Sequence, residues 1–387
     1  MKQGWEYKKL GEVCEVVSGS TPKTNIPEYW GNGHYWVTPA ELNDTTIYID
    51  KTERQITDEA LNKTKLRLLP VGTVLLSSRA PIGKVAITNT EMYCNQGFKN
   101  CICSDSIYNK YLFYFLRLKK DYLNSLGRGA TFKEISKSIV ESIKLPLPPK
   151  PTQLAIVSEL DKINELIRLK KEQLKDLDKL AQSIFYEMFG DPVENEKGWE
   201  VKMLGDVCSV GTGSTPNRRN KDFYENGIYP WVKSTEVCNL PIYSVEEYIT
   251  QDALDKTNCT LYPQNTILMA MYGQGKTRGQ IGLLKIEACT NQAVAAIVPT
   301  KEVVDENYIC LHLMLMYEHI RNMARGGNQA NLNLSIVKSI QILLPPLPLQ
   351  HLFAHRIELI EHQKSEVQKA ITDLETLLAS RMQYWFE

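Results

Sequence analysis

The sequence predicts an α+β protein in which two similar mixed, strand-rich domains are joined by two long helices that pair as an antiparallel coiled coil. Three observations predict this architecture. A set of short motifs occurs twice, each copy contains short apolar runs separated by Gly, Pro and Asn, and each copy ends in a long heptad-patterned segment. A period of about 195 residues is too long for a solenoid repeat and corresponds to a whole domain with its connector.

The duplicated motifs keep the same order in both halves of the chain. Their spacing is nearly constant, so the halves differ by small loop insertions and deletions. The pairs are Gly4-Trp5-Glu6 and Gly198-Trp199-Glu200, Leu10-Gly11 and Leu204-Gly205, Gly19-Ser20-Thr21-Pro22 and Gly213-Ser214-Thr215-Pro216, Trp36-Val37 and Trp231-Val232, Asn95-Gln96 and Asn291-Gln292, and Ser138-Ile139-Val140 and Ser335-Ile336-Val337. We place the first domain at residues 1–150, the first helix at 151–190, the second domain at 191–347 and the second helix at 348–387.

Each domain is expected to hold short strands, one helix and a closing proline cluster. Short apolar runs bounded by turn residues predict the strands, and apolar residues near a spacing of 3.6 predict the helix. Proline fixes φ and ends regular elements, so the proline clusters mark domain boundaries. The strand segments are 71–76 and 85–87 with equivalents at 266–269 and 281–284, the helices are 109–126 and 306–324, and the prolines lie within 146–151 and 345–348.

Each long segment carries a heptad seam over about five heptads, with apolar residues in alternating steps of four and three. One lysine lies in the middle of each seam, as a polar register marker would. We expect the helices to pair within the chain; the alternatives are packing on their own domains or pairing with another chain. The seams are Ile156, Leu160, Ile163, Ile167, Lys170, Leu174, Leu177, Ala181, Ile184, Met188 and Phe353, Ile357, Ile360, Lys364, Val367, Ile371, Leu374, Leu378, Arg381, Trp385.

Composition is that of an ordinary globular protein. The chain has 387 residues, of which 43% are hydrophobic and 23% charged, and its formal net charge is zero. A zero net charge argues against a general nucleic-acid coat but allows local basic patches. No apolar run approaches a membrane span and the N-terminus shows no signal peptide, so we expect a cytoplasmic protein without membrane contact. The nine cysteines are scattered without C-x-x-C spacing, which predicts buried reduced thiols.

Enzyme motifs are incomplete. Gly275-Lys276-Thr277 ends like a phosphate-binding loop, but Ala270 stands where its first glycine belongs. His351 and His355 have the spacing of a zinc helix, but its glutamate is replaced by Leu352. Neither a methyl-transfer motif nor the strand–loop–helix setting of a cofactor site is present. The sequence therefore predicts a non-catalytic chain without cofactor or metal.

Taken in order, the motifs resemble the specificity (S) subunit of type I restriction-modification systems. The resemblance rests on G-W-x-x-x-x-L-G-[ED]-V, G-S-T-P, Ser-Ile-Val, the proline cluster and a helix ending Leu180-Ala181-Gln182-Ser183-Ile184-Phe185, repeated over the whole chain. The second helix departs from this pattern at 378–385. The resemblance implies two target recognition domains, each reading half of a bipartite double-stranded DNA site. It also implies that the helices act as a spacer and dock two methyltransferase subunits, and that restriction subunits join them.

Loop residues with basic, amide or hydroxyl side chains are the candidate DNA-binding residues, because Arg and Lys bind phosphate and guanine edges while Asn and Gln suit adenine. For each, an ordinary solvated loop is the alternative, and the two Asn-Gln pairs would equally satisfy turn backbone groups. The candidates are Ser20, Thr21, Arg79, Lys84, Asn95, Gln96, Lys99 and Arg128 in the first domain, and Ser214, Thr215, Arg218, Arg219, Lys221, Tyr272, Gln274, Lys276, Arg278, Asn291, Gln292, Arg325, Asn328, Gln329 and Asn331 in the second.

Equivalent loops differ in sequence between the domains, so we expect the two half-sites to differ. Two other functions are compatible with the sequence. The chain could be a coiled-coil adaptor without a DNA role, or the DNA-recognition part of a fused restriction-modification enzyme. The varied basic loops argue against the first, and the missing catalytic motifs argue against catalysis in this chain.

Overall fold

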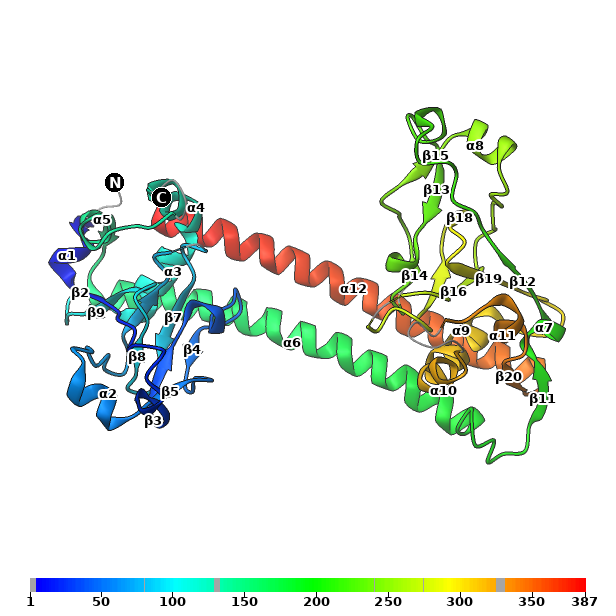
Figure 1. Ribbon diagram of the computed structural model, residues 1–387, viewed down its shortest axis with the longest axis horizontal. Helices are drawn as coiled ribbons and strands as arrows, with labels where there is room; N and C mark the ends of the chain where they lie inside the picture. The colour runs from blue at the N-terminus through cyan, green and yellow to red at the C-terminus, as the bar shows by residue number, and fades with distance from the viewer. Residues whose placement is uncertain (1–4, 80, 129–132, 240, 274, 325–330) are drawn as a thin grey trace. The chain divides into compact units, whose positions relative to one another are not determined.

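The computed structural model describes residues 5–79, 81–128, 133–239, 241–273, 275–324 and 331–387. The chain forms two compact units, Met1–Lys171 with Lys369–Glu387, and Glu172–Gln368. Each unit contains a strand-rich domain, part of the helix α6 (Lys150–Phe189) and part of the helix α12 (Leu347–Phe386). Both helices are continuous ribbons in Figure 1, with no break where one unit passes into the other.

The first unit contains a five-stranded sheet in the order β2-β9-β6-β7-β4, a three-stranded sheet β5-β3-β8 and a two-stranded sheet β1-β10. Most neighbours are antiparallel, while β4–β7 and β3–β8 are parallel, so the sheets combine both directions. The strands are β1 Glu6–Lys9, β2 Cys14–Ser18, β3 Trp30–Val37, β4 Tyr48–Ile49, β5 Gln55–Ile56, β6 Val74–Leu76, β7 Val85–Thr88, β8 Tyr93–Cys94, β9 Lys99–Cys103 and β10 Lys144–Leu147.

The second unit repeats this topology strand for strand, in the orders β12-β19-β16-β17-β14, β15-β13-β18 and β11-β20. Its parallel pairs, β14–β17 and β13–β18, are the equivalents of those in the first unit. The duplication predicted from the motifs is therefore a duplication of fold. The strands are β11 Glu200–Met203, β12 Cys208–Thr212, β13 Tyr229–Val232, β14 Pro241–Ile242, β15 Tyr248–Ile249, β16 Ile267–Ala270, β17 Ile281–Leu284, β18 Cys289–Thr290, β19 Val294–Pro299 and β20 Gln341–Leu344.

The structure has the helical stretches predicted at 109–126 and 306–324, but neither stretch is a single helix. Each is two short helices, separated at Lys119 (φ −84°, ψ 15°) and at Met316 (φ −82°, ψ 8°). Both segments of the first pair bury apolar side chains, including Leu123 on the second segment. These helices are α3 Asn109–Leu118, α4 Lys120–Leu126, α9 Glu306–Leu315 and α10 Tyr317–Asn322.

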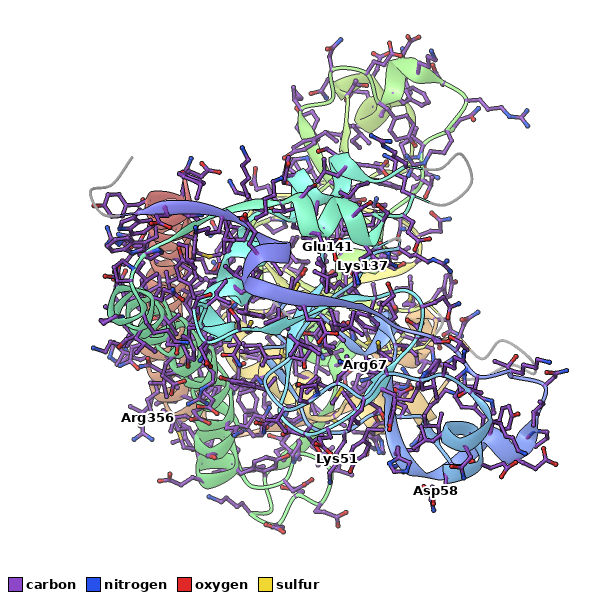
Figure 2. All side chains as sticks on the ribbon, turned by 90° about the vertical axis from the view of Figure 1, so that its left-hand side faces the viewer. Lys51, Asp58, Arg67, Lys137, Glu141 and Arg356 are labelled. Carbon is purple, nitrogen blue, oxygen red and sulfur yellow. The ribbon has the colours of Figure 1, made fainter. Side chains whose placement is uncertain are left out.

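The remaining helical segments are short and occur as equivalent pairs in the two units. In the first unit they are α1 Leu10–Val13, η1 Pro27–Tyr29, η2 Pro39–Glu41, α2 Asp58–Lys63 and α5 Lys137–Ser142. In the second they are α7 Leu204–Val207, η3 Lys221–Phe223, η4 Ser234–Glu236, α8 Gln251–Lys256 and α11 Leu334–Lys338. Figure 2 labels Lys137 and Glu141 on α5, where their charged atoms form an i,i+4 ion pair at 3.6 Å. Such exposed pairs stabilise a helix only slightly.

The predicted heptad seams are the buried faces of the two long helices. In the first unit Glu159 on α6 accepts a hydrogen bond from Arg381 on α12, and Lys171 Nζ on α6 lies 2.7 Å from the Glu375 carboxylate on α12. In the second unit Lys364, the expected polar seam residue, lies 2.8 Å from Asp178. A second contact in that unit joins Arg356 Nη1 to the Met188 sulfur at 3.7 Å. In each unit the residue numbers on α12 fall as those on α6 rise, so α6 and α12 pack together in an antiparallel coiled coil, as predicted.

Each domain core receives the C-terminal end of a long helix. In the first unit the Phe386 ring lies 5.0 Å from Tyr111 and 5.9 Å from Phe115. In the second unit Phe185 and Phe189 enter a cluster with Tyr308 and Phe353. All these aromatic side chains are nearly or fully buried. Burial of one such side chain contributes about 2 kcal/mol or more, so the helix ends are part of the domain cores.

The cysteines are free thiols, but not all are buried as expected. Cys238 is exposed and Cys103 is partly buried. Burial holds the pKa of the Cys94 and Cys310 thiols at about 12. These two thiols are therefore protonated and unreactive at neutral pH.

Candidate nucleic-acid interface

The Gly-Ser-Thr-Pro motif of the first unit packs directly on the Asn-Gln turn between β8 and β9. A Cβ on Gly19 would lie 1.8 Å from the Asn95 carbonyl oxygen, so only glycine permits this approach. The Ser20 backbone N–H donates to the Cys94 carbonyl at 2.9 Å. The Thr21 hydroxyl donates to the side-chain oxygen of Gln96. Two motifs separated in sequence thus form one surface.

The second unit repeats this arrangement. A Cβ on Gly213 would lie 1.8 Å from the Thr290 carbonyl oxygen, and the Thr215 hydroxyl donates to the Gln292 side chain. Gln96 and Gln292 are both exposed. The repeated motifs therefore present the same hydroxyl–amide pair at the surface of each unit.

Asn95 and Asn291 hold their turns. Asn95 Oδ1 accepts the Gly97 N–H at 2.9 Å, and Asn291 Oδ1 accepts the Ala293 N–H at 3.0 Å. This is the backbone role that the sequence left open beside DNA contact. In both units the Asn side chain positions the neighbouring glutamine.

A buried tryptophan fixes each Gly-Ser-Thr-Pro segment from below. Trp36 Nε1 donates to the Ser20 carbonyl at 3.2 Å, and Trp231 Nε1 donates to the Ser214 carbonyl at 3.0 Å. Both indoles are almost fully buried. The loop geometry is thus set by main-chain contacts, which leaves the outer side chains of the loop free to vary.

Three charged side chains, Arg79, Lys99 and Glu134, form a cluster of ion pairs near the Asn-Gln turn of the first unit. Glu134 accepts from Arg79 Nε at 2.8 Å and from Lys99 Nζ at 3.2 Å. Burial works to raise the pKa of Glu134, but hydrogen bonds from Arg79 and Lys99 lower it below its usual value. Lys99 is only 7% exposed, whereas Arg79 and Arg128 are exposed. Lys99 therefore positions Glu134 from inside, and Arg79 carries the accessible charge.

Main-chain contacts connect this cluster to the Asn-Gln turn. The Ser78 N–H donates to the Gly97 carbonyl at 2.7 Å, and Arg128 and Glu134 exchange two backbone hydrogen bonds of 3.0 Å. Lys84 Nζ donates to the Pro39 carbonyl at 3.0 Å. We call the resulting continuous surface the first-unit loop surface; it comprises Ser20, Thr21, Arg79, Lys84, Gln96, Arg128 and Glu134.

The second unit builds the same backbone with other side chains. The Met271 N–H donates to the Ala293 carbonyl at 2.8 Å, as Ser78 does to Gly97, and the Leu332 N–H donates to the Met271 carbonyl at 3.1 Å. This register places Tyr272, Asn331 and Ala295 at the positions of Arg79, Glu134 and Lys99. Tyr272 is 40% exposed. We call this the second-unit loop surface; it comprises Ser214, Thr215, Tyr272, Gln292 and Asn331.

The glycine-rich loop after Tyr272 is held by two side chains that sequence reasoning missed. The Tyr317 hydroxyl donates to the Lys276 carbonyl at 2.6 Å. Arg321 Nη1 donates to the Gly275 carbonyl at 2.9 Å and to the Arg278 carbonyl at 3.3 Å. Both donors lie on α10, far away in sequence from the loop. The Lys276 side chain is exposed and that of Arg278 is partly buried.

The other predicted cations of the second unit lie around η3. Arg219 and Lys221 are exposed, and Lys221 is 3.8 Å from Glu225. Arg218 forms an ion pair with Glu247, which also lies 3.0 Å from Lys233 Nζ.

The remaining candidates, Gln274, Arg325, Asn328 and Gln329, lie outside the described residues.

Two further findings concern metals and membranes. Within the described ranges, no three His, Cys, Asp or Glu side chains gather as a metal site would require. Over the same part of the chain, no helix combines the length and apolar character of a membrane span.

The protein thus contains a duplicated domain whose exposed loops differ between the copies, together with the two long helices α6 and α12. The sequence model of the type I restriction modification DNA specificity domain matches residues 2–179 and again 196–375. The chain therefore belongs to the family of type I restriction-modification specificity subunits.

Named relatives support this assignment. The MjaIX specificity subunit of Methanocaldococcus jannaschii is 31% identical over 96% of this chain and 90% of its own length. The EcoR124I/EcoR124II specificity subunit of Escherichia coli is 30% identical over 42% of this chain and 41% of its own.

Solved structures show the same fold. An S subunit from M. genitalium has a TM-score of 0.58 at 15% identity and covers 99% of this chain and 96% of its own. A chain from a study of type I R-M complex assembly and conformational transition has a TM-score of 0.68 at 18% identity, and covers 99% and 97%.

Proposed function

We propose that this chain is the DNA-reading, non-catalytic subunit of a type I restriction-modification complex, and that it recognises an asymmetric bipartite site on double-stranded DNA. Domains 1–150 and 191–347 each read one half-site. One observation carries the proposal. The two loop surfaces share their backbone, while Arg79, Lys99 and Glu134 in one correspond to Tyr272, Ala295 and Asn331 in the other.

Such a pair of surfaces has the properties that asymmetric reading requires. A common backbone presents side chains at the same positions, so each domain meets its half-site in the same manner. Different side chains then select different base edges, because a guanidinium favours guanine acceptors and an amide favours adenine. Thr21 with Gln96 and Thr215 with Gln292 are alike in both units, which suits contacts to features common to both half-sites.

The partners follow from the family and from the exposed faces of the long helices. Large apolar side chains remain exposed on these helices, among them Leu166 and Leu169 on α6 and Leu359 and Leu377 on α12. Exposed apolar residues on helices suit docking of further subunits. We infer that two methyltransferase subunits bind there and that restriction subunits join in the cytoplasm, as in the family.

The direct experiment is selection of DNA from a randomised duplex library by the complex of this chain with its methyltransferase subunits. We expect two short, different half-sites separated by a gap of fixed length and random sequence. A single uninterrupted site, two identical half-sites, or retention of DNA without sequence preference would contradict the proposal. Salt must be held constant across the selections, because phosphate contacts make the affinity depend strongly on ionic strength.

The long helices are proposed to set the gap. Four residues inserted after Lys170 add about one helical turn and, because four is not a heptad, introduce a stutter. We expect both half-sites to persist and the preferred gap to lengthen by one or a few base pairs. An unchanged gap in a folded, DNA-binding protein would show that the helices do not act as the spacer.

A further inference from the structure

An exposed arginine covers a pair of aromatic rings in the first unit. The Trp30 and Trp36 rings meet edge to face at 4.9 Å. The guanidinium carbon of Arg54 lies 3.8 Å from the Trp30 centroid and 5.4 Å from that of Trp36. Arg54 itself is exposed, and no carboxylate among the described residues forms an ion pair with it. Its N–H donors therefore face solvent beside the rings.

The second unit contains the same arrangement. Tyr224 and Trp231 meet edge to face at 6.4 Å. The guanidinium carbon of Arg218 lies 4.8 Å from the Tyr224 centroid and 4.7 Å from that of Trp231. A cavity of about 420 Å³ opens beside this pair and is lined by Arg218, Lys221, Tyr224, Glu225, Glu247 and Tyr248.

The two arginines come from non-equivalent positions. The Trp36 N–H donates to the Arg54 carbonyl at 3.2 Å, and the Trp231 N–H donates to the Glu247 carbonyl at 3.0 Å. The position of Arg54 is therefore held by Glu247 in the second unit. Counting from the shared Gly-Ser-Thr-Pro motif, the position of Arg218 is held by Thr24 in the first unit.

Common descent of the two halves does not explain this match, because the duplicated position changed from arginine to glutamate or the reverse. A guanidinium on the aromatic pair was kept while the loop segment that supplies it changed. A purely structural cation–π contact at an exposed site is weak and is easily replaced. A requirement for this group at this place explains the exchange.

The aromatic pairs lie directly under the proposed DNA surface. Trp36 Nε1 donates to the Ser20 carbonyl, and the next residue, Thr21, holds Gln96. Trp231 makes the corresponding contact with Ser214. Each arginine is thus linked through one indole to the hydroxyl–amide pair that both loop surfaces share.

We propose that Arg54 and Arg218 are equivalent contacts to the DNA backbone, one for each half-site, with the aromatic pair holding the planar guanidinium in position to bind a phosphate. The inference rests on the proposed function; it gives the candidate Arg218 a specific role and adds Arg54, which the sequence did not single out. A contact common to both half-sites positions the protein, so it carries affinity without sequence preference. Glu247 neutralises part of the charge of Arg218, so the contribution of Arg54 should be the larger.

The test uses the complex with methyltransferase subunits and its selected DNA site, with affinity measured across a salt series. Arg54→Gln should weaken binding to every sequence alike and reduce the slope of log K against log salt by about 0.9, the share of one phosphate. Arg67→Gln is the matched control, since Arg67 is exposed in the same unit, pairs with Glu15 at 3.1 Å and is labelled in Figure 2. Its slope should equal that of the wild type.

A double variant that moves the arginine from position 54 to position 24 separates phosphate binding from a purely structural role. Arg54→Glu alone should weaken binding more than Arg54→Gln, and adding Thr24→Arg should restore part of the affinity and of the slope, because the first unit then has the partly neutralised arrangement of the second. Thermal unfolding of each variant verifies folding. An unchanged slope in Arg54→Gln, a loss confined to particular bases, or no restoration by Thr24→Arg in a folded protein would overturn the inference. Failure of the wild-type complex to select any site would instead contradict the proposed function.

Discussion

The C-terminal ends of α12 and α6 enter the cores of different units and are held there by different chemistry. In the first unit Arg381 and Trp385 Nε1 both donate to the Glu159 carboxylate, at 3.1 Å for each of two bonds, and Trp385 stacks on Trp5 at 6.2 Å. In the second unit the same positions hold Ile184, Met188 and Arg356, and Arg356 Nη1 lies 3.7 Å from the Met188 sulfur.

The buried aromatic residue at the end of the helix is common to both units. Phe386 is 3% exposed and Phe189 is fully buried. The partly exposed polar contacts around it have changed completely. The loop surfaces show the same division, since Gly19 and Gly213 agree and Arg79 and Tyr272 do not. Residues that determine the backbone or fill the core are repeated, and those that face outward have diverged.

The largest expected effect is at the repeated glycines. Gly19→Ala and Gly213→Ala each place a Cβ 1.8 Å from a carbonyl oxygen, which only backbone displacement can relieve. We expect each to destabilise its own unit by about 5 kcal/mol, in the range of exceptional substitutions. Calorimetric unfolding measures this, and a loss below about 1 kcal/mol in either unit would show that the shared loop geometry is not required.

Truncating the buried phenylalanine near the C-terminal end of each long helix, Phe386 or Phe189, should destabilise its unit by nearly as much as the glycine substitutions. Phe386→Ala and Phe189→Ala each remove a buried ring and leave a cavity, for an expected loss of about 4 kcal/mol. Urea unfolding of the two variants measures it. Losses differing by more than about 2 kcal/mol between the two variants would contradict the equivalence of the helix ends.

A buried histidine makes the two cores differ in their response to acid. His312 is fully buried where the first unit has Phe115, and burial lowers its pKa from 6.5 to about 3. Because the folded pKa is depressed, the stability that neutral His312 contributes is complete above pH 6.5 and is lost as pH falls toward 3. Between pH 7 and pH 5 the second unit should lose about 2 kcal/mol from this group.

The substitution that tests this copies the first unit. In His312→Phe the loss between pH 7 and pH 5 should shrink by about 2 kcal/mol, as measured by urea unfolding at both pH values. The Phe115 of the first unit shows that the repeated fold accommodates the ring. An identical acid response in wild type and variant would mean that folding does not lower the pKa of His312.

The smallest effect is expected at the polar contact of the first unit. Hydrogen bonds from Arg381 lower the pKa of Glu159 despite a raising effect of partial burial. Both side chains are about one-third exposed, at 32% and 34%, so solvent screens the pair. Arg381→Met should destabilise the unit by less than about 1 kcal/mol at pH 7, with the difference disappearing as acid protonates Glu159. A loss above 2 kcal/mol would make this contact part of the core.

Sequence reasoning could find the duplication, the seams and several strand segments, because buried periodicity leaves a local pattern. It could not give the order of the strands in the sheets. It could not place Tyr317 and Arg321 under the glycine-rich loop, since main-chain contacts between distant segments leave no pattern. Nor could it find Arg54, whose role shows only when Trp30 and Trp36 are seen beneath it. The break at Lys119 escaped for a related reason, because the apolar spacing continues through it.

The most direct test of asymmetric reading exchanges the side chains that distinguish the loop surfaces. Arg79→Tyr, Lys99→Ala and Glu134→Asn together give the first unit the neutral set of the second while retaining the backbone. Site selection from a randomised duplex library, with the variant in complex with methyltransferase subunits, measures the result. We predict that one half-site changes while the other half-site and the gap stay as in the wild type. An unchanged bipartite site, or a simultaneous change in both halves, from a folded complex would contradict the account.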